Sequence, residues 1–97
     1  MIERIDENEK RFDNISLVIS KLEKELDNFY SKKKTLDLLN NYYGSSEWFL
    51  DKELYESGSI PPIKAGVLSE DAIWNLNDKI DELVDKMQFI INEFKNK

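Results

Sequence analysis

The fold is decided by residues 42–48, which read Tyr42-Tyr43-Gly44-Ser45-Ser46-Glu47-Trp48. Gly44 stands where a helix that ends in a left-handed residue needs a glycine. Ser45 or Ser46 can act as the N-cap of a following helix, because a serine hydroxyl accepts a hydrogen bond from a free backbone amide. The segment therefore predicts the end of one helix and the start of another within a few residues.

On the N-terminal side of this junction, apolar residues recur at alternating spacings of three and four. The stripe comprises Ile5, Phe12, Ile15, Ile19, Leu22, Leu26, Phe29, Leu36 and Tyr43, with Asn8, Lys33 and Asn40 in its remaining positions. This heptad pattern, with Ile5 in position a, and the absence of proline and glycine predict one long helix over residues 1–43. The pair Asp13-Asn14 is the one place where we expect a bend.

The C-terminal side of the chain has the same pattern. Its stripe consists of Ile73, Leu76, Ile80, Leu83, Met87, Ile90 and Phe94. Ser69 is a suitable N-cap, and Glu70 and Asp71 place negative charge in the first turn, where the helix dipole favours it. Lys95 and Lys97 place positive charge at the other end, so we expect a second long helix here.

Between the two stripes lies a segment that contains most of the turn-forming residues. A short helix is expected over residues 47–55. Ile60-Pro61-Pro62-Ile63 must then be extended, because each proline pushes its predecessor out of the helical region. Gly66 permits the turn into the last helix. We predict a single all-α domain whose last helix packs antiparallel to the first, with a long helix over 1–43, a junction over 44–68 and a final helix over 69–97.

The lengths of the two long helices predict a homodimer. At 1.5 Å per residue, the first would extend about 63 Å and the last about 39 Å. A last helix that runs back from Tyr43 would therefore end near Leu17, and the N-terminal half of helix one would have no partner in its own chain. We expect that half to pair with a second copy, with Asn8, Lys33 and Asn40 setting the register.

Composition disfavours several classes of chemistry. The chain has neither cysteine nor histidine, which removes the thiolate nucleophile, the zinc–thiolate site and the usual general base near neutral pH. No glycine-rich phosphate loop or EF-hand spacing occurs. We therefore expect no enzyme activity, no metal and no cofactor. The net charge of −6 also disfavours direct binding to nucleic acid, because the phosphate backbone carries the same sign of charge.

The sequence carries no sign of export or of a membrane anchor. The N-terminal residues are charged and lack the apolar core of a signal peptide. No apolar run approaches the roughly 18 residues that a transmembrane helix requires. We therefore expect a cytoplasmic protein without membrane contact.

Aromatic residues of the junction form the first candidate for binding another protein. They are Tyr42, Tyr43, Trp48 and Tyr55. Tyrosine and tryptophan dominate the energetics of many protein interfaces, so these side chains could form a recognition surface. The same side chains could instead fill the end of the helical hairpin where the chain turns. Both interpretations can hold together if Trp48 lies inside and a tyrosine outside.

Acidic residues of the last helix form the second candidate. Asp71, Asp78 and Asp85 recur every seven residues, on the side of the helix that faces away from its apolar stripe. Such a ridge could bind a basic partner or imitate the spacing of phosphates. An ordinary solvated face has the same composition.

Several short motifs resemble a known family. They are Tyr42-Tyr43-Gly44-Ser45, Glu47-Trp48, Asp51, Gly58, Pro61 and Gly66-Val67-Leu68-Ser69-Glu70-Asp71-Ala72. Together they resemble the small bacterial proteins catalogued as domain of unknown function 4298, over most of the chain. Ile60-Pro61-Pro62-Ile63 and Trp74 depart from that pattern, in which a more polar stretch and a tyrosine are typical. The resemblance implies a bacterial, intracellular, all-helical protein, and it supplies no activity.

These observations favour a non-catalytic cytosolic protein for protein–protein interaction, an adaptor whose partner is unknown and which is itself homodimeric. Gly44, Ser45, Gly66 and Ser69 are expected to shape the junction rather than to bind. The alternative is an acidic inhibitor of antitoxin or phage-inhibitor type, which would use the aspartate ridge against a nucleic-acid-binding enzyme.

Overall fold

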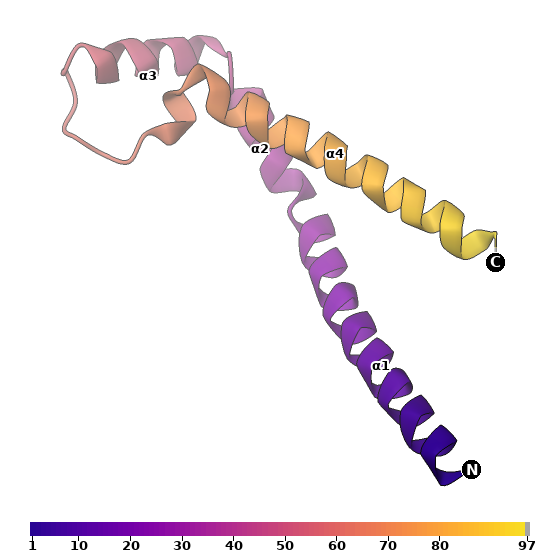
Figure 1. The fold of residues 1–97 in the computed structure, drawn as a ribbon. Coiled ribbons are helices and arrows are strands. Elements are labelled where there is room, and N and C mark those ends of the chain that lie inside the picture. Colours follow the sequence, from indigo (N-terminus) through magenta and orange to yellow (C-terminus); the bar gives the residue numbers. More distant parts are fainter. Residues whose placement is uncertain (97) are drawn as a thin grey trace. The chain divides into compact units, whose positions relative to one another are not determined.

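The computed structural model describes residues 1–96; Lys97, one of the two lysines expected at the end of the last helix, lies outside the described residues. The elements in chain order are α1 (Ile2–Ser31), α2 (Lys33–Tyr42), α3 (Ser46–Glu56), the 3-10 turn η1 (Gly66–Leu68) and α4 (Glu70–Lys95) (Figure 1). No strand occurs among residues 1–96. The all-α prediction is therefore confirmed.

The first long helix is interrupted at Lys32, which corrects the prediction of one continuous helix to Tyr43. The Lys32 amide donates to the carbonyl of Phe29, 3.1 Å away. This bond spans three residues instead of the four of an α-helix, so the turn is the narrower one of a 3-10 helix. The Ser31 hydroxyl donates to the carbonyl of Asn28 at 2.6 Å, and such bonds from serine to the preceding turn bend helices. By contrast, α1 continues without a break through residues 13–14, where we expected a bend.

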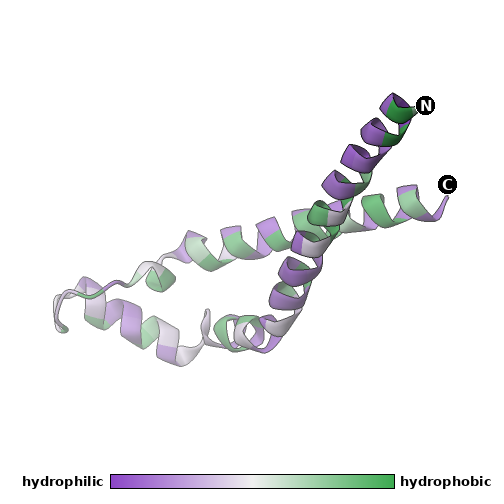
Figure 2. Ribbon diagram, turned by 90° about the horizontal axis from the view of Figure 1, so that it is seen from below, coloured by the Kyte–Doolittle hydropathy of each residue, from purple (hydrophilic) through white to green (hydrophobic). Residues whose placement is uncertain are grey.

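The chain divides into two units, one from Met1 to Leu38 and one from Leu39 onward. The first unit consists of α1 and the start of α2, and α1 contains no buried residue. Its apolar stripe follows the heptad pattern, so hydrophobic and hydrophilic residues alternate along the ribbon that begins at the N-terminus (Figure 2). The helix is therefore amphipathic with its apolar side exposed.

The second unit contains a small core built from three elements. Its buried side chains are Trp48 of α3, Leu68 of η1 and Ile73 of α4. Residues 59–65 have no regular helix and connect α3 to η1, as the two prolines predict. The core therefore lies where the start of α3 meets the turn into α4.

The helices of the second unit begin and end as their capping residues predict. Ser45 is the N-cap of α3 and its hydroxyl accepts the amide of Trp48 at 3.2 Å. Ser69 is the N-cap of α4 and accepts the amide of Asp71. Gly44 has φ +75°, the left-handed conformation for which glycine is preferred. The structure selects Ser45 rather than Ser46 as the cap.

Contacts between α2 and α4 fix the direction of these two helices at their meeting point. Tyr43, just after α2, bonds to Glu70, and Asn40 bonds to Asn77. The chain positions move backward on one helix as they move forward on the other. The end of α2 and the start of α4 therefore run antiparallel within the second unit.

Candidate functional site

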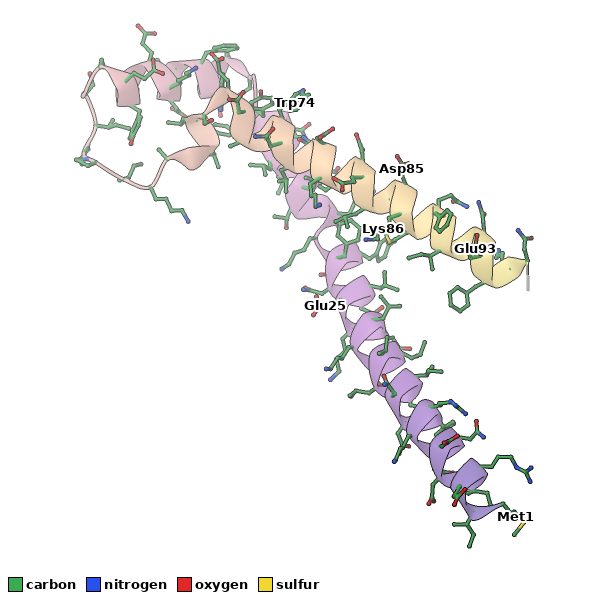
Figure 3. The ribbon with its side chains drawn as sticks, viewed as in Figure 1. Met1, Glu25, Trp74, Asp85, Lys86 and Glu93 are labelled. Carbon is green, nitrogen blue, oxygen red and sulfur yellow. The ribbon has the colours of Figure 1, made fainter. Side chains whose placement is uncertain are left out.

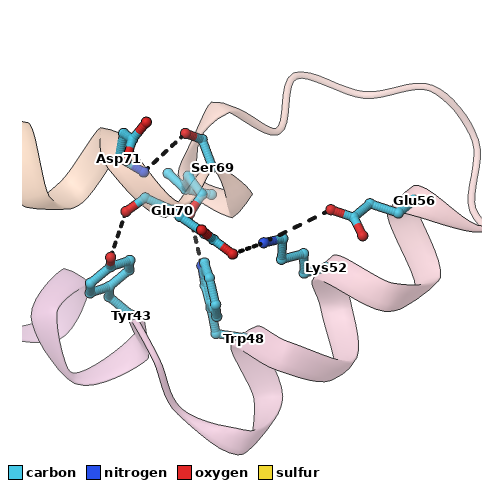
Figure 4. A network of polar contacts seen from close by, with 8 residues as sticks. Tyr43, Trp48, Lys52, Glu56, Ser69, Glu70 and Asp71 are labelled. Carbon is cyan, nitrogen blue, oxygen red and sulfur yellow. Dashed lines mark hydrogen bonds and ion pairs between the residues drawn. The ribbon is translucent and has the colours of Figure 1, made fainter.

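Trp48 is the centre of the junction, and its side chain is only 3% exposed. It lies in the first turn of α3, and its indole Nε1 donates to the carbonyl of Val67 at 2.9 Å (Figure 4). The Tyr43 ring packs edge-on at 5.2 Å between centroids and the Phe49 ring at 5.0 Å, a geometry that aromatic pairs prefer. Trp48 thus joins α3 to the segment that leads into α4.

Lys52 adds a positive charge beside Trp48, and no motif of the sequence indicated this residue. Its ammonium lies 5.3 Å from the centre of the Trp48 ring and 2.9 Å from Glu70 Oε1, with Glu56 at 3.9 Å (Figure 4). Trp48 and Lys52 are four residues apart on one helix, so their contact was accessible from spacing alone. The contact to Glu70, eighteen residues further on, required the fold.

The pair of Lys52 and Glu70 is electrostatically matched. The hydrogen bond to Glu70 raises the pKa of Lys52, and the same bond lowers the pKa of Glu70. Because the pKa of Glu70 is lower in the folded chain, the pair supports folding above the ordinary glutamate range and loses its effect as the pH falls. Glu70 therefore acts in the first turn of α4 both as a dipole partner and as a tie to α3.

The two tyrosines of the junction make different bonds. Tyr43 donates its hydroxyl to the backbone carbonyl of Glu70 (Figure 4). Tyr42 donates its hydroxyl to Asp51 at 2.7 Å. This bond raises the pKa of Tyr42 to about 12, because the ionised ring would face a carboxylate. Both hydroxyls are thus used within the chain.

A half-open hollow of about 280 Å³ lies between α3 and the segment that follows it. Its lining consists of Tyr42, Asp51, Leu54, Ile60, Ile63, Lys64, Ala65, Val67 and Leu68. Most of these side chains are apolar, and Asp51 supplies the acidic group. Among the junction candidates, Tyr42 borders this hollow, and the side chain of Tyr55 is exposed on α3.

Asn40 and Asn77 form a pair that the sequence did not indicate. Asn77 donates to the Asn40 side-chain carbonyl at 2.8 Å, and Asn40 donates back at 3.3 Å. A second hydrogen of the Asn77 amide goes to the carbonyl of Ile73 at 3.0 Å. Asn40, predicted as a register-setting position of the first stripe, thus has its partner on α4 of the same chain.

The aspartate ridge lies along one side of α4. Asp71, Asp78 and Asp85 are all exposed, and Figure 3 shows Asp85 and Trp74 on this helix. No ion pair to these aspartates is found within residues 1–96. In the same range, no cluster of acidic side chains is arranged to hold a metal ion. The ridge is therefore a row of separate, solvated carboxylates.

Gly66 and the remaining junction residues complete the turn into α4. Gly66 begins the 3-10 turn whose last residue, Leu68, is buried. The Ser69 amide donates to the Gly66 carbonyl at 3.1 Å before α4 begins.

Over the part of the chain that is described, no helix has the length and apolar character that crossing a membrane requires.

The fold and the junction define a small all-α protein whose capped helices meet around one buried tryptophan. Its sequence matches the family described as Domain of unknown function (DUF4298) over residues 5–90. The chain belongs to this family, as the junction motifs predict. Comparison with curated proteins and with solved structures found no match.

Proposed function

We propose that this protein is a non-catalytic cytoplasmic adaptor that binds other proteins and forms a homodimer through the N-terminal half of α1. The observation that carries the proposal is the exposed stripe of α1. Its members Phe12 and Ile15 are 68% and 63% exposed. Contiguous apolar faces of this kind mark interaction surfaces in proteins that are not embedded in a membrane.

The length of α4 supports pairing with a second copy rather than with the same chain. The 26 residues of α4 extend about 39 Å, whereas α1 and α2 with 30 and 10 residues extend about 60 Å along their axes. Counted from the Asn40–Asn77 contact, even an α4 that followed the first helices closely would end near residue 22, because α4 ends eighteen residues after Asn77. The stripe from Ile5 to Ile15 would still need another partner.

The chemistry of the junction supports a binding role rather than a catalytic one. The side chains with shifted pKa values are Tyr42, Lys52 and Glu70, and each makes a bond that joins two elements of the fold. Tyr42 bonds to Asp51 of α3, and Lys52 of α3 bonds to Glu70 of α4. Tyr55, which is 39% exposed, and the start of α4 are part of the exposed surface of this unit. An external protein would meet the molecule there while the N-terminal half of α1 holds the dimer.

The homodimer is tested by light scattering coupled to size exclusion at tens of micromolar. Wild-type protein should run as a dimer and Ile15→Asp as a monomer. Leu17→Asp is the matched control, because Leu17 is 57% exposed but lies outside the stripe, and it should remain a dimer. A fully helical wild-type monomer at this concentration would sink the proposed homodimer.

The binding role is tested by affinity purification from the native host. Tyr55→Ala should lose partners that the wild type retains. Tyr30→Ala, which removes a tyrosine that is 77% exposed on α1, should retain them. Equal recovery of partners by wild type and Tyr55→Ala would contradict a junction-centred surface.

The alternative, an acidic inhibitor of a nucleic-acid-binding enzyme, is supported by the exposed aspartates Asp71, Asp78 and Asp85 of α4, which have no ion pair within residues 1–96. It predicts that changing Asp78 and Asp85 to lysine abolishes inhibition, and that binding weakens steeply with salt. Retained binding by this double variant excludes the alternative and leaves the adaptor proposal standing.

A further inference from the structure

We infer that the two copies of α1 lie parallel and in register, so that Asn8 of one copy faces Asn8 of the other. This inference rests on the proposed homodimer and specifies its geometry. It concerns the first unit only, where the stripe of α1 is exposed along its length. The occupant of that stripe is a second copy of this chain.

Asn8 is the polar residue of the stripe near the N-terminus, and it selects among the possible arrangements. In a parallel pair in register, each stripe residue meets its own copy, whereas in an antiparallel pair position d meets position a. Every antiparallel overlap that stays within α1 and includes Ile15 therefore sets Asn8 against an apolar residue, which is Phe12, Ile19 or Leu26 according to the overlap. A polar amide against an apolar side chain loses hydrogen bonds that it had with water.

The bonds that Asn8 already makes leave room for its copy. Its Nδ2 donates to the Arg4 carbonyl at 2.8 Å, and its Oδ1 accepts from Arg11 at 3.1 Å. An asparagine amide has two N–H donors and an oxygen with two lone pairs. One donor and one acceptor site therefore remain, which is what a reciprocal bond between two asparagines requires.

The flanking charges agree with the parallel arrangement. In a parallel pair, a residue of position g lies beside position e of the next heptad, which brings Arg4 to Glu9 of the other copy. Neither side chain has an ion pair within residues 1–96. An antiparallel pairing of the N-terminal halves sets Arg11 against Arg11 and Glu9 against Glu9. A longer antiparallel overlap relieves that repulsion but places Asn8 against Ile19.

The absence of cysteine from the chain allows a direct test by single cysteine substitutions. Disulfides require Cα atoms within about 7 Å. Ile5→Cys should form an interchain disulfide in a glutathione buffer, because residue 5 faces its own copy in the parallel pair. In antiparallel pairs whose overlap includes Ile15, the two copies of residue 5 lie about 15 Å apart or more along the axis. Lys10→Cys, on the outer side of the helix, is the control and should remain uncrosslinked.

The outcomes separate the geometry from the dimer itself. A dimer by light scattering in which Ile5→Cys stays uncrosslinked, while a mixture of Ile5→Cys and Ile15→Cys crosslinks, would overturn the parallel arrangement and leave the dimer. Crosslinking of Lys10→Cys to the same extent as Ile5→Cys would also overturn it. If light scattering under reducing conditions finds only a monomer, both the parallel arrangement and the homodimer are overturned.

The role of Asn8 is tested in the Ile5→Cys background by adding Asn8→Leu. The dimer should become tighter, because an apolar residue replaces a polar one in the stripe. The crosslinked fraction at residue 5 should fall, because the antiparallel arrangement no longer buries an amide against an apolar side chain. An unchanged crosslinked fraction would show that Asn8 does not select the orientation.

Discussion

Replacing Trp48 with alanine should remove the centre of the second unit's core. Among residues 1–96, the core has three buried side chains, of which Trp48 is the largest. The substitution leaves the rings of Tyr43 and Phe49 without their common partner. Truncating a buried tryptophan to alanine costs about 3–5 kcal/mol of folding free energy. A chain of this length has a total stability of about 5–15 kcal/mol, so the loss is a large part of the whole.

The indole N–H can be separated from the volume of the ring by a second variant. Trp48→Phe keeps much of the aromatic packing and removes the bond to the Val67 carbonyl, which is 2.9 Å long. Loss of a single bond of this kind costs about 1 kcal/mol, and more if the carbonyl stays dry. The phenylalanine variant should therefore lie between wild type and the alanine variant.

Thermal unfolding followed by circular dichroism measures these effects. For a domain of this size each kcal/mol lowers Tm by about 4–8 °C, so Trp48→Ala should lower it by about 12 °C or more. The matched control is Trp74→Ala, because Trp74 is 62% exposed on α4 (Figure 3) and should change stability by about 0.5 kcal/mol at most. Equal shifts for the two alanine variants would refute the assignment of Trp48 as the core residue.

Further changes test individual contacts of the same unit. Asp51→Asn should bring the pKa of Tyr42 from about 12 down towards the ordinary 10.0, as read from tyrosinate absorbance. Since the pKa of Tyr42 is higher in the folded chain than in the unfolded one, the bond to Asp51 supports folding below pH 10, and its contribution should disappear as the pH rises towards 12. A Tyr42 that titrates near pH 10 in the wild type would contradict this. Gly44→Ala should cost about 1–2 kcal/mol because φ is +75°, whereas Gly66→Ala, with free space and no positive φ, should cost little in urea unfolding; equal costs would refute the backbone argument. Leu68→Ala should destabilise by about 2–5 kcal/mol, and a change below that range would show that the buried turn is not part of the core.

Helix ends were the most predictable part of this fold, because each depends on a few neighbouring residues. Gly44 and Ser69 specify a left-handed residue and an N-cap through their own chemistry. The choice of Ser45 over Ser46 was not determined, since either hydroxyl can cap. The break at Lys32 was missed because it depends on the Ser31 hydroxyl competing for a backbone carbonyl.

Contacts across the fold were less predictable than local ones. Asn40 and Asn77 lie thirty-seven residues apart, and nothing in either helix alone indicates that they meet. The alternatives for Trp48, interior or surface, were open from its residue type, and burial among α3, η1 and α4 places it inside. Whether Tyr55 and the aspartate ridge bind a partner remains a prediction, because exposure is common to interfaces and to ordinary surface.

The absence of any buried residue in α1 bears on when this helix is ordered. A helix whose apolar side faces water depends on local interactions alone, and in isolation such helices are marginal. If pairing supplies the missing burial, the ordered fraction must rise with the amount of protein, by mass action. At low protein concentration α1 would fray and be open to proteolysis, and at high concentration it would be protected. The degree of order of α1 would thereby depend on how much of the protein the cell contains.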